Sequence, residues 1–416
     1  MGVFKYLLDL GATVMLPIII FVLGVALGQK PGKAFRSGVV IGIGFVGIGL
    51  VLGVLVGNLG PAAQAMVKRL GIELTVVDVG WPAAAAIAFA SRAGALIIPL
   101  GLAVNIAMLL GRATRTVNVD IWNFWHFAFT GALVTAATGR LWLGVLAAAA
   151  NAAIVLKLGD WTAPMIQDFY GIPGISLPHG FSAAYVPIAL PLDRVIDRIP
   201  CINKISIDPE SIQERYGIVG DPTVLGVILG LILGVLAGYD VKRALNLSIS
   251  MAAVMFLMPR MVKVLMEGLI PVSEAAREFM QKRFGGRSFY IGLDSAIAVG
   301  HPAAIATAII LVPITIVLAA VIPGNRVLPF GDLATIPFMV AMVAPIVRGN
   351  VFRSVVIGAV VIGVGLLIAT NVAALHTQAA IEAQFTLPEG ATLISSICDG
   401  ANPLTWLLMK IASLLG

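Results

Sequence analysis

Long apolar runs separated by short polar loops dominate the chain. The runs fall near residues 11–28, 38–56, 83–110, 124–138, 141–156, 222–238, 244–265, 303–322, 333–347 and 354–372, with a weaker one at 391–413. A helix rises about 1.5 Å per residue, so about 20 apolar residues cross the ~30 Å hydrocarbon core of a bilayer. The pattern therefore predicts ten or eleven membrane-embedded segments.

Two apolar stretches do not fit a continuous helix. Residues 171–190 and 291–302 are interrupted by Gly and Pro. Irregular backbone exists at membrane depth only where protein buries it or where it lines a wet cavity. We therefore expect re-entrant or broken segments at both places.

The sequence also repeats itself. LGVALGQKPGKA at 23–34 matches LGVLAGYDVKRA at 233–244, at an offset of 210. LPHG at 177–180 lies opposite ICDG at 397–400, at an offset of 220. These matches indicate two homologous halves of the chain, each with about five spans.

The halves, roughly 1–205 and 206–416, should have opposite orientations, because five spans bring the chain to the other side of the membrane. Charge supports this inverted repeat. With the amino terminus outside, the cytoplasmic loops hold 18 of the 27 Lys and Arg residues, and the outside segments hold 7. Cytoplasmic loops of membrane proteins carry such an excess.

Composition strengthens the membrane assignment. Hydrophobic residues make up 59% of the chain and charged residues 12%, and the mean hydropathy is +1.01; soluble domains carry about 25% charged residues. The net charge of +6 is spread in ones and twos between apolar runs, which argues against a nucleic-acid-binding face and leaves membrane lipid as the surrounding partner. Cys201 and Cys398 have no metal-binding or disulfide spacing, and we assign them no chemical role.

Polar side chains inside apolar surroundings are costly there, so they are the first candidates for function. Asp78 and Trp81 precede the third span, where an interfacial loop anchored by the Trp is an equal alternative. His126 and Thr130 lie four residues apart and share one helical face, beside Trp122. The alternative for this His is a hydrogen bond that joins two helices.

The broken stretches supply further candidates. His179 lies beside non-helical backbone whose polar groups a ligand's hydroxyls would satisfy; otherwise the ring bonds neighbouring carbonyls. Asp294 lies within an apolar stretch, where burial favours the protonated form of a carboxylate, so it is the expected proton acceptor. His301 occupies the repeat position of Trp81. Asp332 stands at the start of a span, where we expect a helix N-cap.

The sequence contains no P-loop, no dinucleotide-binding fingerprint and no metal-ligand triad. We therefore expect no cofactor, no metal and no nucleotide site that would energise transport. The residues alone leave open a proton-coupled polyol transporter that does not phosphorylate its substrate. A scaffolding membrane protein is a third possibility, against which the repeat and the buried polar residues argue.

At these motifs the chain resembles the galactitol-type IIC permeases of the bacterial phosphotransferase system, in the ascorbate-galactitol superfamily. The resemblance covers nearly the whole chain. Its most specific strings are TRTVNVDIWNFWHFAFTGAL at 114–133, IGLDSAIAVGH at 291–301 and PGNRVLPFGDLATI at 323–336. The chain ends at Gly416, before a further apolar span that the resemblance leads us to expect.

The resemblance implies an all-α polytopic protein of the bacterial inner membrane, with two inverted repeats, re-entrant segments and an elevator-type division into two domains. The scaffold domain would comprise residues 1–60 and 220–270 and would form a homodimer. Residues 61–219 and 271–416 would form the core domain that binds substrate and moves.

The resemblance also implies a function. The chain would carry a sugar alcohol, with galactitol as the expected substrate, while a cytosolic IIB subunit charged by IIA phosphorylates it from a cysteine. This subunit would therefore not be an enzyme on its own. The substrate-binding positions implied by the resemblance or by local polarity are His126, Thr130, His179, Asp294, Asp78, Trp81, His301 and Asp332.

Overall fold

The computed structural model describes residues 12–72, 74–200, 202–207, 221–284, 289–329, 331–388 and 390–415. Cys201, to which the sequence assigned no role, lies outside the described residues.

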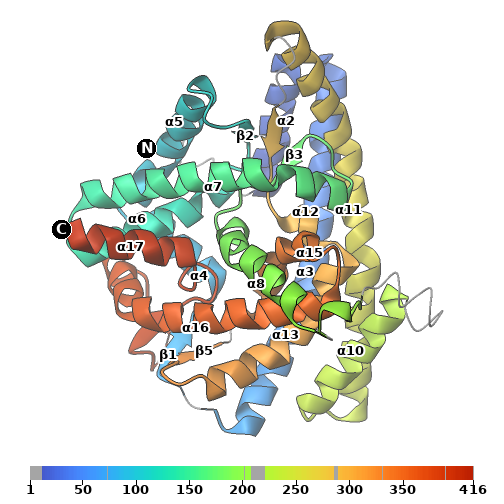
Figure 1. Cartoon of the computed structure of the whole chain (residues 1–416), viewed down its shortest axis with the longest axis vertical. Helices are drawn as coiled ribbons and strands as arrows, with labels where there is room; N and C mark the ends of the chain where they lie inside the picture. Colours follow the sequence, from blue (N-terminus) through green and yellow to red (C-terminus); the bar gives the residue numbers. More distant parts are fainter. Residues whose placement is uncertain are drawn as a thin grey trace.

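Four helices form one side of the molecule: α2 (Ala12–Ala26), α3 (Pro31–Leu70), α10 (Pro222–Leu236) and α11 (Val241–Phe284). In Figure 1, α3 and α11 run along the long vertical axis. Glycines let these two helices approach closely, since a Cβ on Gly44 would lie 2.6 Å from the Cβ of Leu265. With 40 residues, α3 is about 60 Å long, roughly twice the thickness of the hydrocarbon core.

The other helices form a second group. They are α4 (Gly80–Ala90), α5 (Ile97–Leu110), α6 (Trp125–Thr138), α7 (Leu141–Tyr170), α8 (Val186–Arg198), α12 (Ala296–Val299), α13 (Pro302–Val321), α14 (Ile336–Ala341), α15 (Val343–Ile346), α16 (Val351–Glu382) and α17 (Pro403–Leu415). Short 3₁₀ turns connect them: η1 (Gly94–Leu96), η2 (Trp122–Phe124), η3 (Ser182–Tyr185), η4 (Ile202–Lys204) and η6 (Leu333–Thr335). In Figure 1, α7, α16 and α17 cross the direction of α3 and α11.

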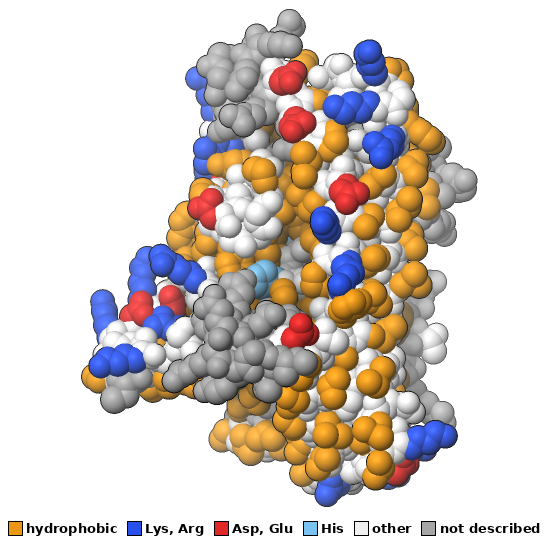
Figure 2. Space-filling model, turned by 90° about the vertical axis from the view of Figure 1, so that its right-hand side faces the viewer, with side chains coloured by type: hydrophobic (Ala, Val, Ile, Leu, Met, Phe, Trp, Pro, Cys, Tyr) orange, Lys and Arg blue, Asp and Glu red, His pale blue; other side chains and the backbone are white. Residues whose placement is uncertain are grey.

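Each predicted apolar run holds a helix. Among the described residues, five helices are long and apolar enough to cross a membrane, or six if the bent pair of α4 and the segment from Gly94 to Leu110 counts as one span. That pair bends by 76°. In Figure 2, hydrophobic side chains are spread along the whole length of the face among charged and other side chains, and such apolar surface suits contact with lipid.

The last predicted run, 391–413, requires a correction. Its helix, α17, begins only at Pro403, where the fixed φ of proline suits a first helical turn. The residues before it form a strand, β6 (Leu393–Ser395), and a buried turn. Hydropathy alone does not separate such a buried strand from a helix.

Two small parallel sheets interrupt the helical fold, and the sequence did not predict them. Their strands are β1 (Val76–Asp78), β2 (Thr116–Asn118), β3 (Ile175–Ser176), β4 (Tyr290–Gly292), β5 (Val327–Leu328) and β6. The strand orders are β5-β1-β6 and β2-β4-β3, so the central strand of each sheet comes from the other half of the chain.

The sheets explain how the broken stretches keep their backbone groups paired. Residues 171–190 and 291–302 are not continuous helices, as predicted, and β3 pairs with β4 between them. Parallel strands end at the same edge of a sheet, so the segments that follow β2, β3 and β4 are brought together. The candidate residues His126, His179 and Asp294 all lie in these segments.

Candidate functional site

A cavity of about 250 Å³ lies between α3 and the broken segments. Phe45 and Ile48 of α3 form one wall. Aromatic side chains contribute much of the rest, namely Trp81, Trp122, Trp125, Phe181 and Phe338. The polar groups at its wall include Asn123, His126, His179, Asp294 and Cys398. An apolar, aromatic lining with a few convergent polar groups is typical of a small-molecule site.

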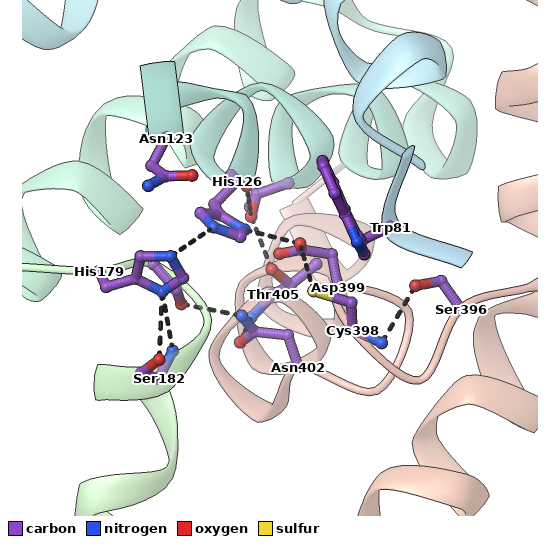
Figure 3. Close-up of polar contacts among 12 residues, drawn as sticks. Trp81, Asn123, His126, His179, Ser182, Ser396, Cys398, Asp399, Asn402 and Thr405 are labelled. Carbon is purple, nitrogen blue, oxygen red and sulfur yellow. Dashed lines mark hydrogen bonds and ion pairs between the residues drawn. The ribbon is translucent and has the colours of Figure 1, made fainter. Parts of the chain in front are cut away.

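His126 stands in the first turn of α6, 1% exposed, and faces the turn that follows β6 (Figure 3). Its Nδ1 lies 2.7 Å from Oδ2 of Asp399, which is fully buried. The Trp125 and His126 ring centroids lie 4.0 Å apart. These contacts hold the imidazole in one orientation with Nε2 directed away from Asp399.

His179 faces His126 across the site (Figure 3). The two Nε2 atoms are 3.4 Å apart, and the Nε2 of His179 is 3.5 Å from Oδ1 of Asp294. The backbone N–H of Ser182 donates to Nδ1 of His179 at 3.2 Å. The close approach requires glycine at 180, because a Cβ there would lie 2.5 Å from the Cβ of His126.

Asp294 follows β4 and approaches the site from the second half of the chain. Its Oδ1 accepts a hydrogen bond from the backbone N–H of Ala296 at 2.9 Å. The side chain is 17% exposed, whereas the other carboxylate of the site, Asp399, is fully buried. Of these two carboxylates, Asp294 is the one that can accept a hydrogen bond from a ligand in the cavity.

Four of the eight predicted side chains line the cavity: Trp81, His126, His179 and Asp294. The other four are not at its wall. Thr130 lies behind His126, where its Oγ1 is 2.7 Å from Oγ1 of Thr405 and accepts from Asn151 at 2.6 Å. His301 caps α13 by accepting from the N–H of Ala303, with its ring against Phe169.

Asp78 and Asp332 form a separate buried cluster at the end of β1. The backbone N–H of Asp332 donates to Oδ2 of Asp78 at 2.9 Å. The carboxylate of Asp332 accepts three hydrogen bonds. They come from the N–H of Trp81 at 2.6 Å, the N–H of Cys398 at 3.0 Å and the hydroxyl of Ser396. This arrangement corrects the expected N-cap. The carboxylate makes no capping bond to its own helix, because these donors from distant segments occupy it.

Asp399, Cys398 and Asn402 complete the site but were not singled out in the sequence. Asn402 donates to the carbonyl of Gly180 at 3.0 Å, and Sγ of Cys398 lies 3.5 Å from Oδ2 of Asp399. The repeat gave a signal for Cys398 and Asp399, because ICDG at 397–400 lies opposite LPHG and places Asp399 at the repeat position of His179. Asn402 lies outside this match.

His126, Cys398 and Asp399 are also the group of possible metal ligands in the described part of the chain, with ligand atoms within 4.8 Å of one another. Two of these atoms, Nδ1 and the carboxylate oxygen, are already joined by a hydrogen bond. We therefore treat the group as a hydrogen-bonded histidine and carboxylate.

Comparisons with known proteins show the family of the chain. Residues 6–390 match the family described as "PTS system sugar-specific permease component". The chain is 48% identical over 411 residues to the "PTS system galactitol-specific EIIC component" of Escherichia coli (strain K12), covering 99% of this chain and 91% of the relative. It is 43% identical over 411 residues to a "Putative permease IIC component" of the same strain, covering 99% of this chain and 94% of that protein. The chain therefore belongs to the sugar-specific permease components of the phosphotransferase system, which are integral proteins of the bacterial inner membrane.

Proposed function

We propose that the chain carries galactitol across the inner membrane and presents it to a cytosolic IIB subunit, charged through IIA, for phosphorylation. The name of the 48% identical relative supports the substrate and the coupling to the phosphotransferase system. The observation that carries the proposal is the meeting of His126, His179 and Asp294 at one cavity wall.

The groups at the wall suit a polyol. A neutral imidazole donates from one nitrogen and accepts at the other, which matches the needs of neighbouring hydroxyl groups. The Trp81 and Trp122 rings offer apolar faces to the C–H surface of the substrate. Thr130, His301, Asp78 and Asp332 serve by holding the surrounding segments in place, since they lie away from the cavity wall.

Asp294 accepts the proton in the proposed reaction. As a substrate hydroxyl oxygen bonds to phosphorus, its proton passes to the carboxylate of Asp294. The bond between phosphorus and the IIB cysteine breaks, and the thiolate leaves. The carboxylate is suited to this role because it lines the cavity and is partly exposed there.

The proposed architecture is a pair of inverted repeats in which the core moves against a dimeric scaffold. The two sheets support the repeat, because each takes its central strand from the opposite half. The cavity supports the domain division, because α3 of the expected scaffold, residues 1–60 and 220–270, forms one wall and the expected core, residues 61–219 and 271–416, forms the rest. Substrate held at such an interface would cross the membrane with the core.

The function is tested with purified chain in proteoliposomes that contain IIA, IIB and a phosphoryl donor. We expect galactitol phosphate to accumulate inside, and a IIB variant whose cysteine is replaced by serine to abolish accumulation. Uptake of unmodified galactitol driven by a proton gradient would instead support the proton-coupled alternative.

A further inference from the structure

We infer that Asp399 fixes His126 in the tautomer whose Nε2 is a hydrogen-bond acceptor, so that His126 and His179 form an acceptor–donor pair for two neighbouring hydroxyl groups. The inference rests on the proposed polyol-binding function and adds a positioning residue, Asp399, to it. It also assigns opposite roles to two histidines that the sequence presents as equivalent.

The argument begins at His179. The backbone N–H of Ser182 can only donate, and it points at Nδ1 of His179 from 3.2 Å. The Oγ of Ser182 also lies 3.2 Å from Nδ1, but a hydroxyl can donate or accept and so fits either tautomer. The N–H donor therefore decides the tautomer, and Nδ1 holds a lone pair. The neutral ring then carries its hydrogen on Nε2, since one ring nitrogen of a neutral imidazole is a donor and the other an acceptor. A protonated ring would direct a second hydrogen at the N–H of Ser182.

The Nε2–H of His179 faces Nε2 of His126 at 3.4 Å. Two N–H groups would repel each other at this distance, so Nε2 of His126 is the acceptor. The hydrogen of the His126 ring must then lie on Nδ1. The contact on the other side of the His126 ring indicates the same tautomer. Nδ1 of His126 lies 2.7 Å from a carboxylate oxygen of Asp399, which is an acceptor when ionised.

The bond to His126 is the main hydrogen bond of the Asp399 carboxylate. The residue is fully buried, and its Oδ1 has no hydrogen-bond partner among the described residues. The other donor to its Oδ2 is the Cys398 thiol at 3.5 Å, and a thiol is a weak donor, so the N–H of His126 supplies much of the stabilisation of this buried carboxylate. A carboxylate that orients an imidazole and sets its tautomer is a recurring arrangement in proteins.

The consequence is a preference for a vicinal diol. The bound substrate would replace the direct contact between the two rings. One hydroxyl donates to Nε2 of His126, and its neighbour accepts from Nε2–H of His179. A substrate in which the first hydroxyl becomes fluorine keeps its size but loses the donor. Such an analogue should bind about 10-fold or more weakly, because fluorine cannot donate a hydrogen bond to Nε2 of His126.

The tautomer can be measured directly, because the chain contains only four histidines. Selective ¹⁵N-histidine labelling of the whole purified protein gives four rings, assigned by single His→Gln variants. We expect His126 protonated at Nδ1 and His179 at Nε2. Asp399→Leu removes the acceptor and should shift His126 toward the Nε2–H form. Asp193→Leu is the matched control, because it removes a carboxylate that pairs with Arg353 and does not line the cavity, and it should leave the His126 tautomer unchanged.

Binding gives the second readout. Affinities for galactitol and for galactitols with one hydroxyl replaced by fluorine are compared in wild type and Asp399→Leu. Wild type should bind at least one fluorinated analogue about 10-fold more weakly than galactitol. Asp399→Leu should bind the same analogue less than about 3-fold more weakly than galactitol. Wild-type His126 protonated at Nε2, or an equal fluorine preference in both proteins, would overturn the inference.

The two readouts separate this inference from the proposed function. The NMR measurement on wild type needs no substrate, and it does not depend on whether Asp399→Leu folds. A wild type that shows the expected tautomers but binds no galactitol would contradict the proposed substrate and leave the role of Asp399 supported.

Discussion

The two small sheets end in polar clusters that have the same construction but different surroundings. At the end of β1, Asp332 accepts hydrogen bonds from Trp81, Cys398 and Ser396, and the cluster is buried. At the end of β4, Asp294 lies 3.5 Å from His179 and remains 17% exposed at the cavity. The chain itself satisfies the first cluster, whereas the second keeps hydrogen-bonding capacity for a ligand.

The comparison teaches that a buried carboxylate in a membrane protein is not by itself a sign of a binding site. Asp332 follows β5 and Asp294 follows β4, and both were candidates in the sequence. Only the donors around them separate a structural role from a ligand-binding one.

The largest effect is expected at the open cluster. Asp294→Asn removes the proton acceptor and should lower phosphorylation-coupled galactitol uptake by roughly 10²- to 10⁴-fold, the range that a general base contributes. The variant should still insert into the membrane, as measured by its amount in purified membranes. Wild-type uptake by Asp294→Asn would refute the role of this carboxylate.

The same substitution in the closed cluster should act on stability. Asp332→Asn replaces a carboxylate oxygen by an amide donor, leaving a buried donor such as the Ser396 hydroxyl or the Cys398 N–H without an acceptor. The expected loss is about 1–3 kcal/mol of stability. Thermal unfolding of the purified protein measures it. The comparison fails if Asp332→Asn is as stable as wild type but no longer binds galactitol.

A smaller effect is expected from the histidines beside the open cluster. His126→Ala and His179→Ala each remove one hydrogen bond to the substrate and should weaken galactitol binding by about 3-fold to 30-fold. Calorimetric titration of folded variants gives the dissociation constants. His376→Ala is a suitable control, because this buried ring on α16 packs against Phe129 and does not line the cavity. Unchanged affinity in both cavity variants would remove the histidines from the site.

The smallest effect on the protein is expected from single cysteine substitutions in two loops. They test whether the two halves have opposite orientations, and they leave both polar clusters unchanged. Single cysteines are placed beside Lys30, Lys33 and Arg36, or beside Lys242 and Arg243, in a background that lacks Cys201 and Cys398. Labelling with a membrane-impermeant thiol reagent should reach the two loops from opposite sides, the first from the cytoplasm. Access from the same side would contradict the inverted repeat.

The sequence predicted the helices well because a membrane span is a local property. The hydropathy of each apolar run is enough by itself to predict a membrane-embedded segment, and each run holds a helix in the structure. It did not predict the sheets, because strands of two or three residues give no periodic signal and their pairing joins distant segments, as in β1 with β6.

The site was predicted in part for the same reason. His126, His179, Asp294 and Trp81 each stand out locally as polar or aromatic residues in unusual surroundings. The bond between His126 and Asp399 joins positions 273 residues apart, which no local pattern contains. The repeat placed Asp399 opposite His179, but a correspondence between halves does not say which side chain the carboxylate meets.

A structure of the purified protein with bound galactitol tests the central claim most directly. We predict density for the polyol between α3 and the broken segments, with hydroxyl oxygens within hydrogen-bonding distance of His126 Nε2 and His179 Nε2 and with Asp294 beside them. A separate recess of about 430 Å³, lined by residues that include Arg92, Thr135 and Glu382, provides the contrasting outcome. Polyol density in that recess, with the cavity at His126 and His179 unchanged, would contradict the account.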